Sequence, residues 1–101
     1  GPLTQQNLEN FHADKVFIAA NGFTLEKGLT TPDLTEAFTK RAMIQGASQV
    51  IALLDHSKFG KNSLTAIASP SELDILITDS GLDQHMKKEM ENIGIQVIIA
   101  E

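Results

Sequence analysis

The sequence predicts an α/β domain in which helices pack on a mostly parallel sheet, in three layers. Four short apolar runs have the composition of buried strands, and segments of helical period alternate with them. The connections that follow the helices are short, whereas those that follow the strands are long and polar. A parallel sheet with right-handed crossovers accounts for both observations.

The composition narrows the classes of function. A chain of 101 residues with 42% hydrophobic residues forms one domain with a real core, and no internal linker divides it. The net charge of −5 lacks the basic footprint of a DNA-binding domain, so any contact with DNA is expected from a domain outside this chain. The only aromatic residues are five phenylalanines, which argues against a base-stacking surface for single-stranded nucleic acid.

The composition also argues against metals and cofactors. Zero cysteines exclude disulfides and thiolate ligands and fit a reducing cytosol. His12, His56 and His85 lie far apart in the sequence and show no metal-ligand spacing. No apolar run approaches the ~20 residues of a membrane span. We expect a cytoplasmic protein without a metal or cofactor.

The elements follow from the apolar patterns. The polar segment from Leu3 to His12 suggests one or two helical turns, and Ser69 to Glu72 reads as a capping box on a single turn. A strand buried on both faces is expected over 15–20, further buried strands over 50–54 and 74–78, a fourth strand over 95–100, and a short strand over 64–68. Helices are expected over 32–45, with Leu34, Ala37, Phe38 and Ala42 on one stripe, and from Leu82, with a core stripe of Leu82, Met86, Met90 and Ile93.

The start of the first long helix is the first candidate site. Either Thr31 is the N-cap with Pro32 at the first helical position, or Asp33 is the N-cap and Glu36 closes a capping box. In both registers the free amides of the first turn point into the loop that begins at Gly28. Such amides, at the positive end of the helix dipole, suit an anion and above all a phosphate. An ordinary capped helix is the alternative.

The polar loops indicate where a ligand would bind. Loops over 21–31, 55–62 and 78–81 all follow strands, so they lie at the carboxyl edge of the sheet. Open α/β sheets bind ligands at that edge. We therefore expect a small-molecule site there.

Lys58 is the candidate cation of this site. It follows a buried strand by four residues and can bring its ammonium near the amides of Thr30 and Thr31. A phosphate would then meet a point charge and backbone donors together. A solvated surface lysine is the alternative.

Two further positions at this edge carry alternatives. Asp55 stands directly at a strand end, where it can hold a ligand hydroxyl, orient Lys58 or simply cap its own loop. Asn21 and Gly22 either present an amide to a ligand or form an ordinary turn.

Five segments together resemble a known family. Residues 14–22, 28–33, 40–44, 55–60 and 77–79 stand in the order found in the C-terminal sensor domain of DeoR-family transcriptional repressors. The similarity covers nearly the whole chain. It implies a Rossmann-like fold built like ribose-5-phosphate isomerase, with residues 1–101 as about the second half of the sensor domain. The winged helix-turn-helix domain of the family is not in this chain.

The resemblance also implies a function and a set of site residues. Effectors of the family are typically phosphorylated sugars or related metabolites, and we expect a phosphorylated sugar or polyol to bind here. The residues carried over from the family are Asn21, Gly22, Gly28, Thr30, Thr31, Lys40, Asp55 and Lys58.

Two other functions stay open. Related isomerases have acidic residues after the first strand and a Glu before the helix lysine. This chain has Ala20-Asn21-Gly22-Phe23 at the first place and Thr39-Lys40 at the second. Isomerisation needs a carboxylate to shuttle a proton, so we expect binding without turnover, and an enzyme would have to use Asp55 or Asp79. The third function is oligomerisation, because an exposed apolar strand pairs readily with another chain. A homo-oligomer is expected.

Overall fold

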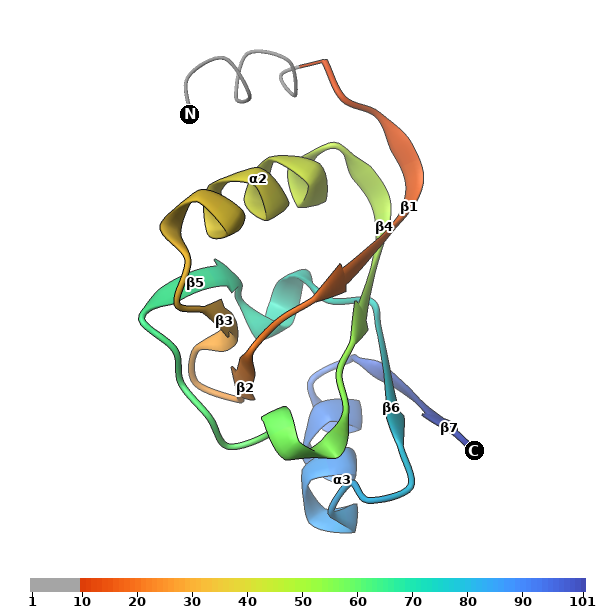
Figure 1. Cartoon of the computed structure of the whole chain (residues 1–101). Coiled ribbons are helices and arrows are strands. Elements are labelled where there is room, and N and C mark those ends of the chain that lie inside the picture. Colours follow the sequence, from red (N-terminus) through yellow and green to blue (C-terminus); the bar gives the residue numbers. More distant parts are fainter. Residues whose placement is uncertain (1–9) are drawn as a thin grey trace.

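The computed structural model describes residues 10–101 (Figure 1). Most of the helical segment predicted over 3–12 lies outside the described residues. The strands are β1 (Ala13–Ala19), β2 (Gly22–Thr24), β3 (Gly28–Thr31), β4 (Ala47–Leu53), β5 (Thr65–Ala68), β6 (Ile75–Asp79) and β7 (Gln96–Ala100). The α-helices are α2 (Leu34–Gln45) and α3 (Gln84–Asn92), and the short 3₁₀ turns are η1 (His56–Lys58) and η2 (Pro70–Glu72).

Two sheets form the domain. The main sheet has the order β1-β4-β6-β7, and all three of its strand pairs are parallel. A small antiparallel sheet has the order β2-β3-β5. The predicted fold class, an α/β domain on a mostly parallel sheet, is confirmed.

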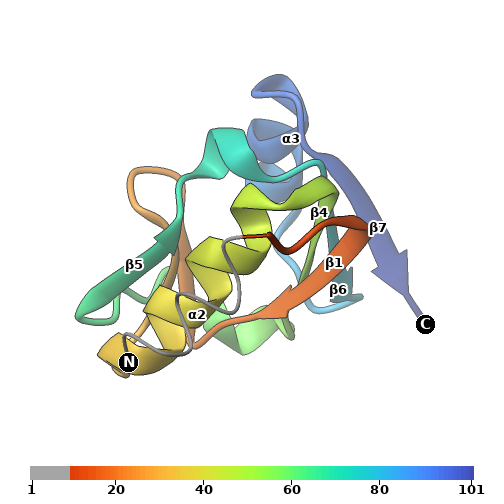
Figure 2. The same ribbon diagram turned by 90° about the horizontal axis from the view of Figure 1, so that it is seen from above.

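Every crossover of the main sheet lies on the same face. Each connection, from β1 to β4, from β4 to β6 and from β6 to β7, advances in the same direction across the sheet. Right-handed crossovers that advance in one direction all pass over one face. Figure 2 accordingly shows α2, β5 and α3 on one side of the four main strands. The core lies between these layers and includes Val16, Ile18, Val50, Ala52, Leu76, Met90 and Ile95.

The opposite face of the sheet is open among the described residues. β1 was predicted to be buried on both faces, and this is wrong: Val16 and Ile18 are buried, but Phe17 is 57% exposed. Leu53 in β4 and Ile98 in β7 are also exposed. Residues 10–101 thus supply the sheet and one of the two outer layers expected from the sequence.

Both helices are present, but each begins two residues later than predicted, at Leu34 and Gln84, and the predicted apolar stripes are only partly buried. Asp33 is the N-cap of α2, and its side chain accepts from the Glu36 amide. The predicted apolar stripe is only partly buried, because Ala37 is covered whereas Leu34 and Phe38 are exposed. In α3 the predicted core stripe holds for Met90 and for Leu82 just before the helix. The single turn η2 is confirmed, with the Ser69 amide donating to Glu72 Oε1 at 2.8 Å.

The segment predicted to be a loop from Asn21 to Thr31 is largely a β-hairpin. Strands β2 and β3 pair through Gly22–Thr30, Phe23–Leu29 and Thr24–Gly28, and β5 adds to the other side of β3. Gly28 makes this packing possible. Its φ is +75°, and a Cβ there would lie 2.0 Å from the Ala68 carbonyl oxygen.

Neither helix of the described chain has the length and apolar character needed to cross a membrane.

Candidate functional site

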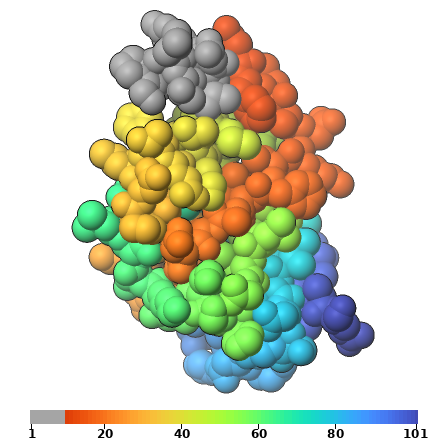
Figure 3. All heavy atoms as spheres, in the orientation of Figure 1, coloured from red at the N-terminus to blue at the C-terminus, as the bar shows by residue number. Residues whose placement is uncertain are grey.

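The carboxyl ends of three parallel strands bring the predicted polar loops to one edge. β1 ends at Ala19, β4 at Leu53 and β6 at Asp79. In Figure 3 the orange surface near residue 20 adjoins the green surface of 55–62, which in turn adjoins the blue surface after β6. The loops that the sequence placed at one rim are therefore neighbours in space.

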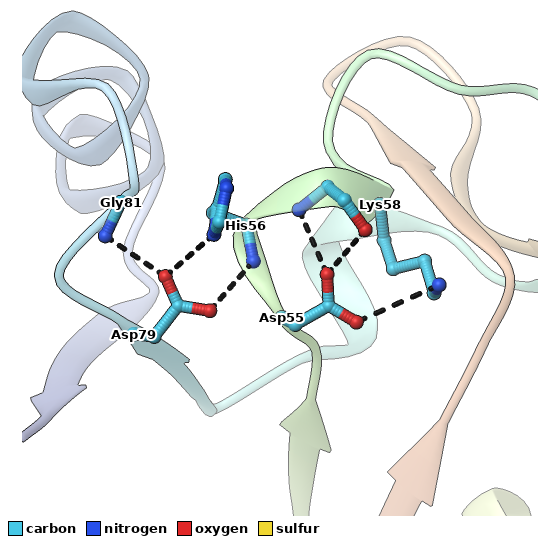
Figure 4. Close-up of polar contacts among 6 residues, drawn as sticks. Asp55, His56, Lys58, Asp79 and Gly81 are labelled. Carbon is cyan, nitrogen blue, oxygen red and sulfur yellow. Dashed lines mark hydrogen bonds and ion pairs between the residues drawn. The ribbon is translucent and has the colours of Figure 1, made fainter.

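Asp55 and Lys58 form an ion pair at this edge (Figure 4). The Lys58 ammonium lies 3.5 Å from Asp55 Oδ2, and both side chains are partly exposed. Asp55 is the N-cap of η1, where it accepts from the Ser57 amide at 2.8 Å and from the Ser57 hydroxyl. These two hydrogen bonds, followed by the charge of Lys58, hold the pKa of Asp55 below its ordinary value. Asp55 thus caps its loop and orients Lys58, as two of the sequence interpretations allowed.

His56 and Asp79 form a second pair, which sequence reasoning missed (Figure 4). Asp79 accepts from the His56 amide at 3.0 Å and from the Gly81 amide at 2.8 Å, and its Oδ1 lies 2.8 Å from His56 Nδ1. The backbone bonds from His56 and Gly81 are the main cause that lowers the pKa of Asp79. The pair fastens η1 to the end of β6. Its only sequence signal is that each residue follows a buried strand.

Asp55, His56 and Asp79 together have the donor types of a cation site. One potential ligand atom from each residue lies within 4.8 Å of the others. However, His56 and Asp79 already contact each other, and Asp55 accepts from the Ser57 amide. The Lys58 ammonium also pairs with Asp55. These contacts explain the cluster as the fastening of two loops, and we assign no metal to it.

The rest of the 55–62 loop is tied to the β2–β3 hairpin. The rings of Phe23 and Phe59 meet edge to face with centroids 5.7 Å apart, and the Gly60 amide donates to the Phe23 carbonyl at 2.9 Å. The Thr24 hydroxyl donates to Asn62 Oδ1 at 2.9 Å. The loop that carries Lys58 is therefore held against the segment that begins at Gly22.

The structure corrects the predicted role of Thr30 and Thr31. Both lie in β3, the middle strand of the small sheet, and they are 1% and 0% exposed. The Thr30 hydroxyl accepts from the Ser63 amide at 2.9 Å, and the Thr31 hydroxyl accepts from the Asp33 amide at 3.3 Å. Their backbone belongs to a strand paired on both sides and does not form an open loop. In the described chain these threonines hold the hairpin together and offer no free group to an anion.

The N-terminus of α2 is likewise occupied by the protein itself. The Asp33 carboxylate accepts from the Glu36 amide at 3.1 Å, which places a negative group where a phosphate was predicted. Glu36 does not complete a capping box, because its carboxylate binds Lys40 and accepts from the Thr31 hydroxyl. The ordinary capped helix, the alternative weighed from the sequence, is what the structure contains.

Lys40 reaches the carboxyl end of β1 from the second half of α2. Its ammonium donates to the Ala19 carbonyl and forms an ion pair with Glu36. The side chain is 19% exposed, so most of its surface is covered. Lys40 therefore joins α2 to the sheet directly before Asn21, which follows β1.

Asn21 and Gly22 sit at the entrance of the hairpin. Asn21 is exposed, and its amide donates to the Thr30 carbonyl at 2.9 Å, so this amide closes the turn and is not free for a ligand. A Cβ on Gly22 would lie 2.3 Å from the Lys61 carbonyl oxygen. The side chain of Asn21 remains available at the rim, whereas Gly22 and Gly28 act through close packing.

A groove of about 350 Å³ lies elsewhere, between α2 and β5. Its walls include the apolar side chains of Leu34, Phe38 and Ala42. None of the residues that line it is a predicted ligand residue. The ion-paired rim at the carboxyl edge, and not this groove, is the site that matches the sequence prediction.

Comparison with known proteins gives the family. Residues 1–80 match the model of the DeoR C-terminal sensor domain. The chain is 39% identical over 101 residues to the HTH-type transcriptional regulator GolR of Listeria innocua, covering 100% of the chain and 40% of that protein. It is 38% identical over 101 residues to the HTH-type transcriptional repressor GlcR of Bacillus subtilis, covering 100% of the chain and 39% of that protein.

A third relative, the HTH-type transcriptional regulator GlpR of Haloferax volcanii, is 37% identical over 98 residues, covering 97% of the chain and 38% of that protein. The chain thus spans about two fifths of the length of these relatives. Their names are those of transcriptional regulators, in agreement with the prediction that the chain is not an enzyme. The family resemblance drawn from the five sequence segments is confirmed, and the chain belongs to the family of DeoR C-terminal sensor domains.

Proposed function

We propose that this chain is part of the effector-sensing domain of a DeoR-type transcriptional repressor and binds a phosphorylated sugar or polyol at the carboxyl edge of its sheet. The observation that carries the proposal is the Asp55–Lys58 pair at that edge. Its ammonium is the right partner for a phosphate, and its carboxylate is the right acceptor for sugar hydroxyls. Open parallel sheets bind ligands at this edge.

Lys58 is the residue that we assign to the phosphate. It is partly exposed, and its ion pair with Asp55 places the ammonium at this edge. The Asn21 side chain, and Lys40 beside the Ala19 carbonyl, border the same edge. Gly22, Gly28, Thr30 and Thr31 contribute by shaping the hairpin that supports it.

Ligand binding would act on the parent regulator through a difference in affinity between two states. A ligand that binds the DNA-released state more tightly shifts the population toward that state. In this proposal the regulator is a cytoplasmic homo-oligomer, and DNA is bound by a domain outside residues 1–101. Sedimentation of the full regulator measures the oligomeric state.

The test is a calorimetric titration of the full regulator with a panel of sugar phosphates and polyol phosphates, each beside its unphosphorylated counterpart. We expect one phosphorylated compound to bind and its counterpart to bind at least about tenfold more weakly, because a charge-assisted phosphate contact contributes ~1.5–3 kcal/mol. Lys58→Ala should remove most of that difference. Lys61→Ala is the matched control, since Lys61 is an exposed lysine of the same loop.

Two outcomes would overturn the proposal. One is that no phosphorylated compound binds. The other is that Lys58→Ala and Lys61→Ala leave affinity, and the release of DNA by the effector, equally unchanged.

A further inference from the structure

A row of four side chains on α2 lines the groove between this helix and β5, which lie next to each other in Figures 1 and 2. The row recurs along the helix at spacings of four, three and four residues, so its members share one face. Its members are Leu34, Phe38, Arg41 and Gln45. All four are exposed, and this face is therefore separate from the helix face that packs on the core.

The groove is bordered by exposed apolar side chains. Leu34 is 65% exposed and Phe38 is 54% exposed. On the other wall, Leu64 directly precedes Thr65 of β5 and is 91% exposed. Three of the seven large apolar side chains that are exposed among the described residues thus border one groove. Exposed apolar side chains that cluster in this way mark an interaction surface.

Arg41 is the single charged residue of the groove wall. No carboxylate of residues 10–101 forms an ion pair with it, whereas Lys40, Lys58 and Lys87 each have such a partner. An arginine guanidinium binds well to the face of an aromatic ring, which would satisfy its charge without a carboxylate. The partner of this surface should therefore present both an aromatic ring and apolar side chains.

We infer that this face of α2 is the surface through which two copies of the regulator associate, with their α2 helices antiparallel about a two-fold axis. The inference rests on the homo-oligomer of the proposed function and names its contact surface. In a two-fold contact each residue meets a given residue of the other copy, and the reverse contact is identical. A second copy fits because the row supplies its own complement.

The spacing of the row gives the register of the two helices. Phe38 and Arg41 are equally far from the middle of the row, and so are Leu34 and Gln45. In an antiparallel pair centred there, each Phe38 ring meets the Arg41 guanidinium of the other copy, and each Leu34 meets the other Gln45. One register therefore forms two cation–π contacts and places the apolar residues between them.

The shape of the groove agrees with this arrangement. Its volume is about 350 Å³, and Ala42 and Ala66 are among the residues that line it. Such small side chains leave room for the Phe38 ring of the other copy. A stable interface covers ~800 Å² on each partner, which is more than one helix face supplies. Leu64 and the β5 wall are therefore expected to belong to the contact as well.

The test is sedimentation of the full regulator over a dilution series. Phe38→Lys would place an ammonium against Arg41 of the other copy at both ends of the contact. Because like charges that face each other across an interface are strongly unfavourable, we expect the dissociation constant of the largest assembly to rise at least about tenfold. Ile93→Lys is the matched control, since Ile93 is a half-exposed apolar residue outside the groove, and it should leave the dissociation constant unchanged.

A charge exchange tests the register itself. In the double variant Phe38→Lys with Arg41→Glu, each new ammonium would face a carboxylate of the other copy. The double variant should therefore regain most of the association that Phe38→Lys loses. Circular dichroism checks that each variant is folded, which is expected because residues 38 and 41 are exposed.

Three outcomes would overturn the inference. One is that folded Phe38→Lys sediments like the natural regulator at every concentration. Another is that the double variant associates no better than Phe38→Lys. The third is that Phe38→Lys lowers the thermal midpoint without changing association, because a segment of the same chain would then occupy the groove.

The failure of this inference is distinguishable from that of the proposed function. A natural regulator that is monomeric at every concentration would overturn the two-fold contact and the proposed homo-oligomer together. Calorimetric binding of a phosphorylated compound, and its loss in Lys58→Ala, would still decide the effector site separately.

Discussion

Asp79 holds His56 at two points, through the ring Nδ1 at 2.8 Å and the backbone amide at 3.0 Å. These contacts fasten the turn after β4 to the end of β6, and hydrogen bonds to the charged carboxylate lower its pKa from 3.8. A carboxylate with a lowered pKa in the folded state stabilises the protein above pH 3.8 and loses that contribution as the pH falls through the folded value.

Asp79→Asn should therefore lower the thermal midpoint at pH 7, with a difference from the natural chain that shrinks as the pH drops below 3.8. Thermal unfolding followed by circular dichroism between pH 7 and about 2.5 measures this difference. Asp14→Asn, at an exposed position in β1, is the control for the substitution itself and should leave the thermal midpoint at pH 7 nearly unchanged. A constant gap between Asp79→Asn and the natural chain at every pH would contradict the assignment.

Gly28→Ala should destabilise the hairpin strongly. The substitution places a side chain at a φ of +75° and drives its Cβ to 2.0 Å from the Ala68 carbonyl oxygen. We expect a loss of about 3 kcal/mol or more in the free energy of unfolding, measured in urea. Gly60→Ala is a close control, because Gly60 has a φ of +84° with nothing within 4 Å of the added Cβ. It should lose only about 1–2 kcal/mol, and equal losses would show that the packing against β5 does not matter.

Lys40→Met should destabilise the fold, because it removes the donor to the Ala19 carbonyl and leaves Glu36 without its ion-pair partner. The Lys40 side chain is 19% exposed and two contacts are lost together, so the expected loss is about 1–2 kcal/mol in the free energy of unfolding. Lys87→Met is the control, since the Lys87–Glu91 pair has the same spacing but spans 3.9 Å on the surface. Its loss should be within about 0.5 kcal/mol. If Lys40→Met lost no more free energy of unfolding than Lys87→Met, Lys40 would not stabilise the contact between α2 and β1.

Effector affinity should fall as salt rises. The proposed phosphate contact joins charge to charge at a partly exposed site, where counterions screen the attraction. Between 50 and 500 mM salt we expect affinity for the phosphorylated compound to drop about three- to tenfold. In Lys58→Ala the drop should be clearly smaller. A salt dependence that is identical in the variant would place the phosphate away from Lys58.

The main sheet could be predicted from the sequence because its signals are local. The apolar run 95–100 nearly coincides with β7, and the run 50–54 overlaps β4, which begins three residues earlier at Ala47. Gly46 and Gly94 follow the helices between strands. The β2–β3 hairpin was missed because its strands are three and four residues long and carry no alternating pattern. What makes them strands is distant in sequence, namely β5 beside β3 and the Ser63 amide on Thr30. The exposure of Phe17 could not be predicted either, because an apolar strand has the same sequence pattern whether the chain covers one or both of its faces.

The sequence predicted which loops lie at one edge of the sheet more accurately than it predicted the contacts that these loops make. Asp55 and Lys58 are neighbours, as their spacing in one short loop suggested. The free donors expected at Thr30 and Thr31 do not exist in the described chain, because a hydroxyl residue before a helix looks the same in an open loop and in a buried strand. The choice between them depended on long-range pairing, which a single sequence does not reveal.

Three consecutive contacts connect β3, α2 and the end of β1. The Thr31 hydroxyl donates to Glu36 Oε2 at 3.4 Å, Glu36 binds Lys40 one turn later, and Lys40 donates to the Ala19 carbonyl. From Ala19 the backbone leads back through Asn21 into the hairpin. Moving β1, the hairpin or α2 separately would therefore break one of these contacts. We expect the three elements to move together at the carboxyl edge of the sheet.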